Sequence, residues 1–352
     1  MHPTARIACG NPAQSAIRNQ MSDKAFAYLV YLLRLGIGVP STSLQPVSAE
    51  EWRIVYSLAA KHAVLGIAWD GVEHLQSQSP QSLQSFPADL MGKWFADVQT
   101  IESANRRMAK QASQLQSFLQ EGEFDAYILK GVSLADYYPK PEHRQSADID
   151  LWVLPKHNSQ APLSVHRKAL LQFLKSREVP VGSVVYHHIE AQFFRDTEVE
   201  LHVTPTWLCN PAHNSRLQQL FAQARQLTPE IQALYALLHA FRHIYHDGLA
   251  LRHLADYYLV REANRQRGLS NIQQTRQIGM SSFAASMDQV ADYLLAEHPC
   301  EIHRLSPRAR HILKELPARQ ISRRIKWDYP AETLFVLPWR AVHYLWRKCH
   351  GY

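Results

Sequence analysis

The stretch that decides the fold reads YILKGVSLADYYPKPEHRQSADIDLWV and spans residues 127–153. Apolar runs of strand length stand at both ends, and GVSLADYY between them is typical of a short helix that PKP ends. Residues 147–154 alternate like a strand, so Asp148 and Asp150 share one face. Twice the rise per residue places their α-carbons roughly 7 Å apart. The sequence therefore predicts a strand with two neighbouring carboxylates on its polar face.

This pair of aspartates has two interpretations. An edge strand with a solvated face carries such residues without any function, and the Asp-x-Asp pattern is common by chance. Two like charges held together would drive one carboxyl to take up a proton, and a divalent cation removes that repulsion. Mg²⁺ is usually bound by one or two carboxylates together with substrate phosphates. The residues around the pair favour the second interpretation.

The residues upstream of the pair are suited to phosphate. Gly131 follows a strand and opens a short helix, which lets backbone N–H groups approach an anion. Ser133 adds a hydroxyl, and Lys130 can neutralise phosphate charge. Arg144, four residues before the first aspartate, offers a planar fork that matches phosphate oxygens. These four residues are therefore predicted to bind phosphate groups.

A third carboxylate is predicted on the strand at 197–204. In TEVELHVT, Glu198, Glu200 and His202 share one face, and apolar residues occupy the other. If this strand lies beside the aspartate strand, a glutamate completes a three-carboxylate cluster. Such clusters hold two metal ions that activate an attacking oxygen and stabilise the leaving one. Glu198 and Glu200 are both candidates for the third carboxylate.

The whole chain predicts an α+β fold, in which helical regions flank a small mixed sheet. Residues 1–21 are expected to be a disordered tail, and 22–121 read as an N-terminal helical region. Residues 122–205 read β-α-β-α-β-β and form the core of the fold. Residues 206–352 return to a helical pattern.

Local signals place some of these elements. Ser22 is expected to cap the first helix, and Ser48–Glu51 forms a capping box for the second. The last two predicted strands, 183–194 and 197–204, form a hairpin around the turn at 195–196.

Composition sets broad limits on function. Hydrophobic residues make up 46% and charged residues 20% of the 352, as in ordinary globular proteins. A net charge of +7 suits phosphate-bearing ligands, nucleic acid or plain solubility, but no motif points to nucleic acid. The four cysteines form no Cys-x-x-Cys pair, which argues against a zinc ribbon and fits a reducing cytoplasm. Without a visible signal peptide or transmembrane segment, we expect a cytoplasmic protein.

Together, these residues resemble the polymerase-β-type nucleotidyltransferase superfamily. Its signature is a Gly-containing turn after a strand, an Asp-x-Asp strand and a third carboxylate on a later strand. The variant LKG…DIDLWV…VELH is similar to an uncharacterised bacterial branch and to abortive-infection toxin nucleotidyltransferases, over roughly residues 50–260. Where the signature has Gly or Ser after the first glycine, Val132 follows Gly131, and the serine comes one position later.

The resemblance implies a chemistry and a role for each residue. An acceptor hydroxyl attacks the α-phosphate of an NTP, and pyrophosphate leaves. Asp148 and Asp150 would bind Mg²⁺ or Mn²⁺ together with Glu200, which lies in the matching phrase VELH and would help to deprotonate the acceptor. The residues that would hold the triphosphate are Lys130, Gly131, Ser133 and Arg144.

Three functions fit this pattern. The first is a metal-dependent enzyme that moves an NMP from an NTP to a hydroxyl of a small molecule or sugar. The second is the same chemistry used as a toxin on tRNA or protein. The third is a non-catalytic module that keeps the nucleotide-binding fold. We predict the first, with an NTP and a hydroxyl acceptor as partners.

Polar residues on the later helices are further candidates for the cleft. His239, His243 and His246 fall at i, i+4 and i+7, with His253 close in sequence. Three interpretations of these histidines stay open: a stripe that lines the cleft, a zinc site, or an ordinary polar helix surface. The candidates for contact with the acceptor or the cleft are His202, His243 and Asp256.

Other polar features have simpler interpretations. Asp256 either contacts the acceptor or base or forms a salt bridge with Arg252 at i−4. His187 and His188 are expected to be exposed on the hairpin. The aromatic, basic tail from Leu334 is expected to pack on its own domain, with a membrane interface or nucleic acid as alternatives.

Overall fold

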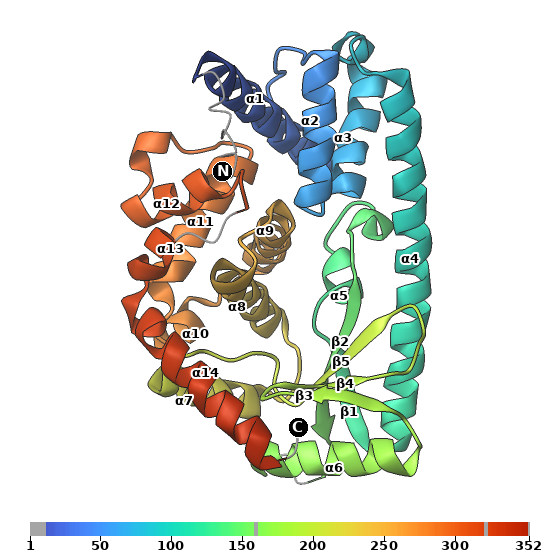
Figure 1. Cartoon of the computed structure of the whole chain (residues 1–352), viewed down its shortest axis with the longest axis vertical. Helices are drawn as coiled ribbons and strands as arrows, with labels where there is room; N and C mark the ends of the chain where they lie inside the picture. Colours follow the sequence, from blue (N-terminus) through green and yellow to red (C-terminus); the bar gives the residue numbers. More distant parts are fainter. Residues whose placement is uncertain (1–11, 158–160, 320–322, 351–352) are drawn as a thin grey trace, which may run out of the picture.

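The computed structural model describes residues 12–157, 161–319 and 323–350 (Figure 1). It combines a mixed sheet with many helices around it, so the predicted α+β class is confirmed. Of the disordered tail predicted at 1–21, residues 1–11 lie outside the described part of the chain, whereas residues 12–21 are helical, so the prediction is wrong for them.

The N-terminal region is helical, as predicted. Its first helix begins at Pro12, so the prediction that Ser22 caps it is wrong; Ser22 lies inside the helix. The capping box at Ser48–Glu51 is confirmed, because the Ser48 N–H donates to Glu51 Oε2 at 2.6 Å and the Glu51 N–H donates to Ser48 Oγ at 3.2 Å. The helices are α1 (Pro12–Gly36), α2 (Ala49–Lys61), α3 (Leu65–Gln78) and α4 (Ala88–Glu121).

Helix α4 runs along the side of the molecule and reaches both the N-terminal helices and the sheet (Figure 1). Its 34 residues span about 51 Å at the helical rise. Trp94, near its start, is fully buried among the N-terminal helices. Leu115 and Leu119, near its end, are buried in the cluster that covers the sheet. One helix therefore joins the two parts.

The described strands form one five-stranded sheet with the order β1-β2-β5-β4-β3. Strands β2 and β5 pair in parallel, and the other pairs are antiparallel. The connections include the short helix α5 (Val132–Ala135) and the helix α6 (Leu163–Ser176). The strands are β1 (Phe124–Ile128), β2 (Asp148–Pro155), β3 (Val181–Val184), β4 (His188–Ala191) and β5 (Glu198–His202).

The predicted strand at 183–194 is wrong, because the chain turns within it. Strand β3 ends at Val184 and β4 begins at His188, and these two strands pair with each other. The pairing of β4 with β5 confirms the hairpin that was predicted around 195–196. The turn at 185–187 contains no Gly, Pro, Asn or Asp, so the sequence carried no turn signal there.

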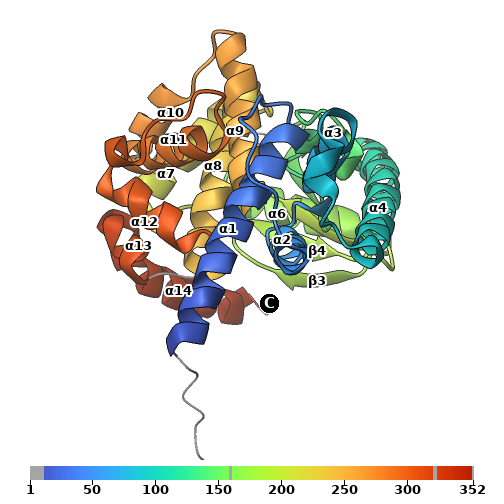
Figure 2. The ribbon, with the colours of Figure 1, turned by 90° about the horizontal axis from the view of Figure 1, so that it is seen from above.

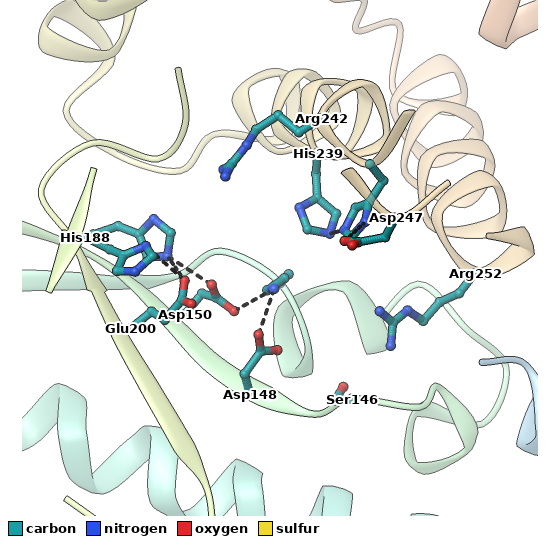
Figure 3. Close-up of polar contacts among 12 residues, drawn as sticks. Ser146, Asp148, Asp150, His188, Glu200, His239, Arg242, Asp247 and Arg252 are labelled. Carbon is teal, nitrogen blue, oxygen red and sulfur yellow. Dashed lines mark hydrogen bonds and ion pairs between the residues drawn. The ribbon is translucent and has the colours of Figure 1, made fainter. Parts of the chain in front are cut away.

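The two faces of the sheet differ sharply in polarity. Ile149 and Leu151 of β2, with Val199 and Leu201 of β5, are buried in a cluster with α4 and α6. The other face carries the acidic residues of both strands and looks toward the C-terminal helices (Figure 3). The alternation predicted for β2 and β5 is therefore confirmed.

The C-terminal region is helical, and α8 and α9 lie between the sheet and the outer helices (Figures 1 and 2). Trp339 of the last helix stacks on Trp207 with ring centroids 4.6 Å apart, so this helix packs back on the core. No described helix is long and apolar enough to cross a membrane. The helices are α7 (Pro211–Ala224), α8 (Pro229–His246), α9 (Leu251–Gln266), α10 (Ile272–Gln277), α11 (Ser281–Leu295), α12 (Pro307–Glu315), α13 (Arg323–Asp328) and α14 (Pro330–His350).

The division of the chain into separate domains stays a prediction. All described strands lie within 122–205. The largest buried cluster joins side chains of α1–α4 with side chains of α7–α9 and α11–α13 and also reaches Trp152 on the sheet.

Candidate active site

The register of β2 and β5 brings the predicted carboxylates together. Asp148 lies opposite Glu198, and Asp150 lies opposite Glu200, in a parallel pair whose matched residues point to the same face. Asp150 is only 1% exposed, whereas Glu198 is exposed. Among the two glutamates, Glu200 therefore lies on the inner, more buried side of the cluster.

Lys130 holds the two aspartates together (Figure 3). Its Nζ lies 3.0 Å from Asp148 Oδ2 and 3.2 Å from Asp150 Oδ2. Burial would lower the pKa of Lys130, but the charges of Asp150 and Asp148 outweigh burial and raise it. The lysine is therefore a firmly charged ammonium at the point between the carboxylates.

Two histidines close the other side of the carboxylate cluster. His202 Nε2 lies 2.9 Å from Asp150 Oδ1 and 3.1 Å from Glu200 Oε2. Burial opposes a charged His202, but its hydrogen bonds with these two carboxylates raise its pKa. His188 Nδ1 lies 3.2 Å from Glu200 Oε2, and burial is the main reason that its pKa falls to about 4. Burial alone would raise the pKa of Glu200, but the hydrogen bond and charge of His202 lower it to about 2.

The expectation that His187 and His188 are exposed is wrong. They are 7% and 9% exposed. His187 Nδ1 accepts a hydrogen bond from Trp207 Nε1 at 3.1 Å. Because the turn at 185–187 folds this segment inward, the pair lines the cleft rather than the solvent surface.

The predicted phosphate turn follows directly after β1. Gly131 has φ +69° and ψ −112°, a conformation that residues with a Cβ avoid. The Ser133 Oγ is buried and makes no hydrogen bond with any described residue. Its backbone carbonyl accepts from Gln232 Nε2 at 3.2 Å, which ties the turn to α8. The turn and an unpaired hydroxyl thus lie beside Lys130.

Arg144 and Asp256 are brought into direct contact with each other. Arg144 donates from Nε and Nη2 to the two oxygens of Asp256 at 2.8 and 2.6 Å, and Tyr138 Oη donates to the same carboxylate at 2.8 Å. The predicted salt bridge of Asp256 is therefore found, but its partner is Arg144 instead of Arg252. Arg252 of α9 donates to the Gln145 carbonyl at 2.9 Å and points toward Ser146 in Figure 3.

A cavity of about 230 Å³ separates the sheet from α8. Figure 3 shows Arg242, His239 and Asp247 on its helical side, opposite Asp150 and Glu200 on the strands. His243 lies on this wall as well, whereas the side chain of His246 lies outside the described residues. The lining residues are Lys130, Asp150, His187, His188, Glu200, His202, Tyr235, His239, Arg242, His243 and Asp247.

Sequence reasoning missed three residues of the helical wall, one of which, Asp247, directly follows the end of α8. Tyr235 and Arg242 line the cavity together with His239 and His243. These positions are spaced i, i+4, i+7 and i+8, so they lie on one face of α8. This helical spacing was visible in the sequence and could have identified them.

A comparison with protein-family models gives one match. The family is described as uncharacterised nucleotidyltransferases, and its model covers residues 48–296. This range is more than half of the chain and contains the carboxylate cluster, the lysine turn and both central helices. The chain belongs to this nucleotidyltransferase family. The family predicted from the sequence is thereby confirmed. Searches of curated proteins and of solved structures gave no match.

Membership in the family supports nucleotidyl transfer as the general function and an NTP as a substrate. Enzymes of this kind generally use divalent metal ions, and Asp150, Glu200 and His202 form a group whose ligand atoms lie within 4.8 Å of one another.

Proposed function

We propose that the protein transfers an NMP from an NTP to a hydroxyl acceptor, releases pyrophosphate and depends on Mg²⁺. The observation that carries this proposal is the parallel register of Asp150 with Glu200, beside Asp148 and next to the Lys130 turn. An acidic group on one wall and basic groups on the other suit a substrate that combines metal ions with phosphates.

The residues of the acidic wall fit a magnesium site. Carboxylate oxygens are the ligands that Mg²⁺ prefers, and Asp148, Asp150 and Glu200 supply them from two adjacent strands. The Lys130 ammonium, which lies within 3.2 Å of Asp148 and Asp150, supports a cation site at this place. When bound, the metal would neutralise charge on the phosphates and activate the attacking oxygen. Mn²⁺ has the same ligand preferences and is the alternative ion.

The remaining side chains support positioning and proton transfer. We assign Glu200 to take the proton of the acceptor hydroxyl, because it borders the cavity and its side chain is 28% exposed, against 2% for Asp150. His202 fixes the orientation of Asp150 and Glu200 through its Nε2. We assign binding of the triphosphate to Lys130, which lines the cavity, and to the adjoining Gly131 turn with the Ser133 hydroxyl.

Arg144 has a different place in this proposal from the one predicted. Its guanidinium is 3% exposed and bound to Asp256, so we assign it to positioning the loop that leads into β2. Asp256, also 3% exposed, is assigned to the same role instead of contact with the acceptor. We assign phosphate contact to Arg242, which lines the cavity from α8, and to Arg252 of α9, which points toward Ser146 (Figure 3).

The test is an assay with each α-³²P-labelled NTP, Mg²⁺ and three acceptor pools: small-molecule extract, tRNA and total protein. We expect label to move to the small-molecule pool with release of pyrophosphate. Asp150→Asn should abolish transfer, because it removes a central ligand charge. Glu198→Gln is the matched control, and we expect it to retain most of the activity.

The outcomes separate the alternatives. Label on tRNA or protein, with growth arrest on expression, would point to the toxin-type function. NTP binding without transfer to any pool, unchanged in the Asp150→Asn variant, would overturn the enzymatic proposal and favour a binding module.

A further inference from the structure

A second group of ligand-type side chains lies on the helical wall of the cleft. His239 and His243 of α8 and His253 of α9 offer ring nitrogens that all lie within 4.8 Å of one another. We propose that these three imidazoles bind one divalent transition-metal ion of the Zn²⁺ class, at a site separate from the carboxylates on the sheet.

The first two ligands have the spacing of a zinc site. His239 and His243 are separated by one helical turn, and their Nε2 atoms lie 3.2 Å apart. A tetrahedral zinc ion with Zn–N bonds of 2.0–2.1 Å holds its nitrogens about 3.4 Å apart. The two nitrogens therefore already lie close to the separation that the ion requires.

A carboxylate is present to orient one of these ligands. Asp247 Oδ2 lies 3.2 Å from His243 Nδ1, a buried nitrogen that makes no hydrogen bond in the described part of the chain. A carboxylate at this position favours the tautomer with the proton on Nδ1, which leaves the Nε2 lone pair free for a metal. Asp247 also supplies a negative charge beside the proposed cation (Figure 3).

His253 supplies the third imidazole from the start of α9. It is only 2% exposed, and its ring stacks on His243 with centroids 4.0 Å apart. Its Nε2 is buried and has no hydrogen-bond partner in the described part of the chain, which is uncommon for a buried polar atom. Its Nδ1 accepts a long hydrogen bond of 3.3 Å from the Ala250 N–H. Binding a metal would cost this one long hydrogen bond and would satisfy the buried ring.

The surroundings keep the three rings in the form that binds metals. Burial, with smaller effects from neighbouring charges such as Lys130, lowers the pKa of His239 and His253 well below the usual value and that of His243 to about 4. All three are then neutral imidazoles at pH 7. His239 and His243 line the cavity, so three protein ligands leave a fourth position open for water or an acceptor oxygen.

The test measures zinc binding directly. Purified full-length protein, stripped of metals, is titrated with Zn²⁺ and with Co²⁺ in a buffer without NTP. We expect one zinc ion per chain, a tetrahedral Co²⁺ absorption spectrum, and imidazole scattering from three ligands in zinc X-ray absorption. Less than stoichiometric zinc, or a spectrum without imidazole scattering, would overturn the proposal.

Variants then locate the ion. His239→Ala and His253→Ala should each lose stoichiometric zinc, and Asp247→Asn should weaken binding about 10–100-fold. His74→Ala, which removes an exposed histidine of α3, is the control and should bind zinc like the wild type. The double variant Asp150→Asn/Glu200→Gln should also keep its zinc. Loss of zinc in that variant, or retention in both His→Ala variants, would place the ion elsewhere and refute the site. Circular dichroism of each variant confirms folding, and the wild-type absorption data stand independently of the variants.

Discussion

Removing the Asp256 carboxylate should destabilise the protein strongly. In the folded protein this carboxylate accepts two hydrogen bonds from Arg144, at 2.8 and 2.6 Å, and one from Tyr138, at 2.8 Å. All three residues are at most 4% exposed. Asp256→Ala would therefore leave the Arg144 guanidinium buried and without its counter-charge.

The size of the effect follows from this burial. Breaking a buried ion pair by removing one partner costs about 3–5 kcal/mol of the free energy of unfolding, since the remaining charge is desolvated without compensation. The matched control is Asp89→Ala, because Arg53 binds Asp89 through both carboxylate oxygens at 2.9–3.0 Å on an exposed surface. Surface pairs contribute little, so we expect no measurable change there.

The assay is urea unfolding followed by circular dichroism and tryptophan fluorescence. The double variant Arg144→Met/Asp256→Leu should recover part of the lost stability, because it removes both charges and keeps apolar volume. The reasoning is refuted if Asp256→Ala unfolds at the same urea concentration as Asp89→Ala. It also fails if the double variant is as unstable as the sum of its single changes.

Further predictions follow from individual contacts. Lys130→Met removes the ammonium between Asp148 and Asp150. We expect Mg²⁺ to raise the melting temperature of this variant more than that of the wild type. Equal shifts would contradict the inference that Lys130 and Mg²⁺ occupy the same position. His143 contacts carboxylates of α3 and α4, and these contacts raise its pKa although burial opposes them. Its stabilising contribution is therefore fully present below about pH 6.5 and disappears as the pH rises through the raised pKa. We therefore expect the difference in unfolding free energy between the wild type and His143→Gln to become smaller as the pH rises through the raised pKa. A difference that grows with pH would contradict this prediction. Gly131→Ala should cost about 1–3 kcal/mol in urea unfolding, because φ is +69° there, and a neutral result would mean that the turn relaxes.

The strands that carry the carboxylates were largely predictable from the sequence. Alternation alone placed Asp148 with Asp150, and Glu200 with His202, on one polar face. Alternation does not say which strands are neighbours, so the choice of Glu200 came from the family resemblance. The one-to-one parallel register provides the physical reason for preferring it over Glu198.

The partners of buried charges were not predictable. Arg144 looked like a phosphate ligand because its planar fork stands four residues before Asp148, yet its partner Asp256 lies 112 positions away. The buried position of His188 depends on a turn without turn residues. Such contacts arise from packing between distant elements, and a local pattern contains no information about them.

The parallel register of β2 with β5 also limits how related sequences can differ in length. Inserting one residue within 148–152 or 198–202 would move Asp150 or Glu200 to the opposite face, into the apolar cluster. The connection between the two strands, at 156–197, contains β3 and β4, which pair in the same sheet and are subject to the same parity. Its segments outside these two strands are not, because their length does not set which side chains face each other. Insertions and deletions among relatives should therefore gather in those segments and spare the paired strands.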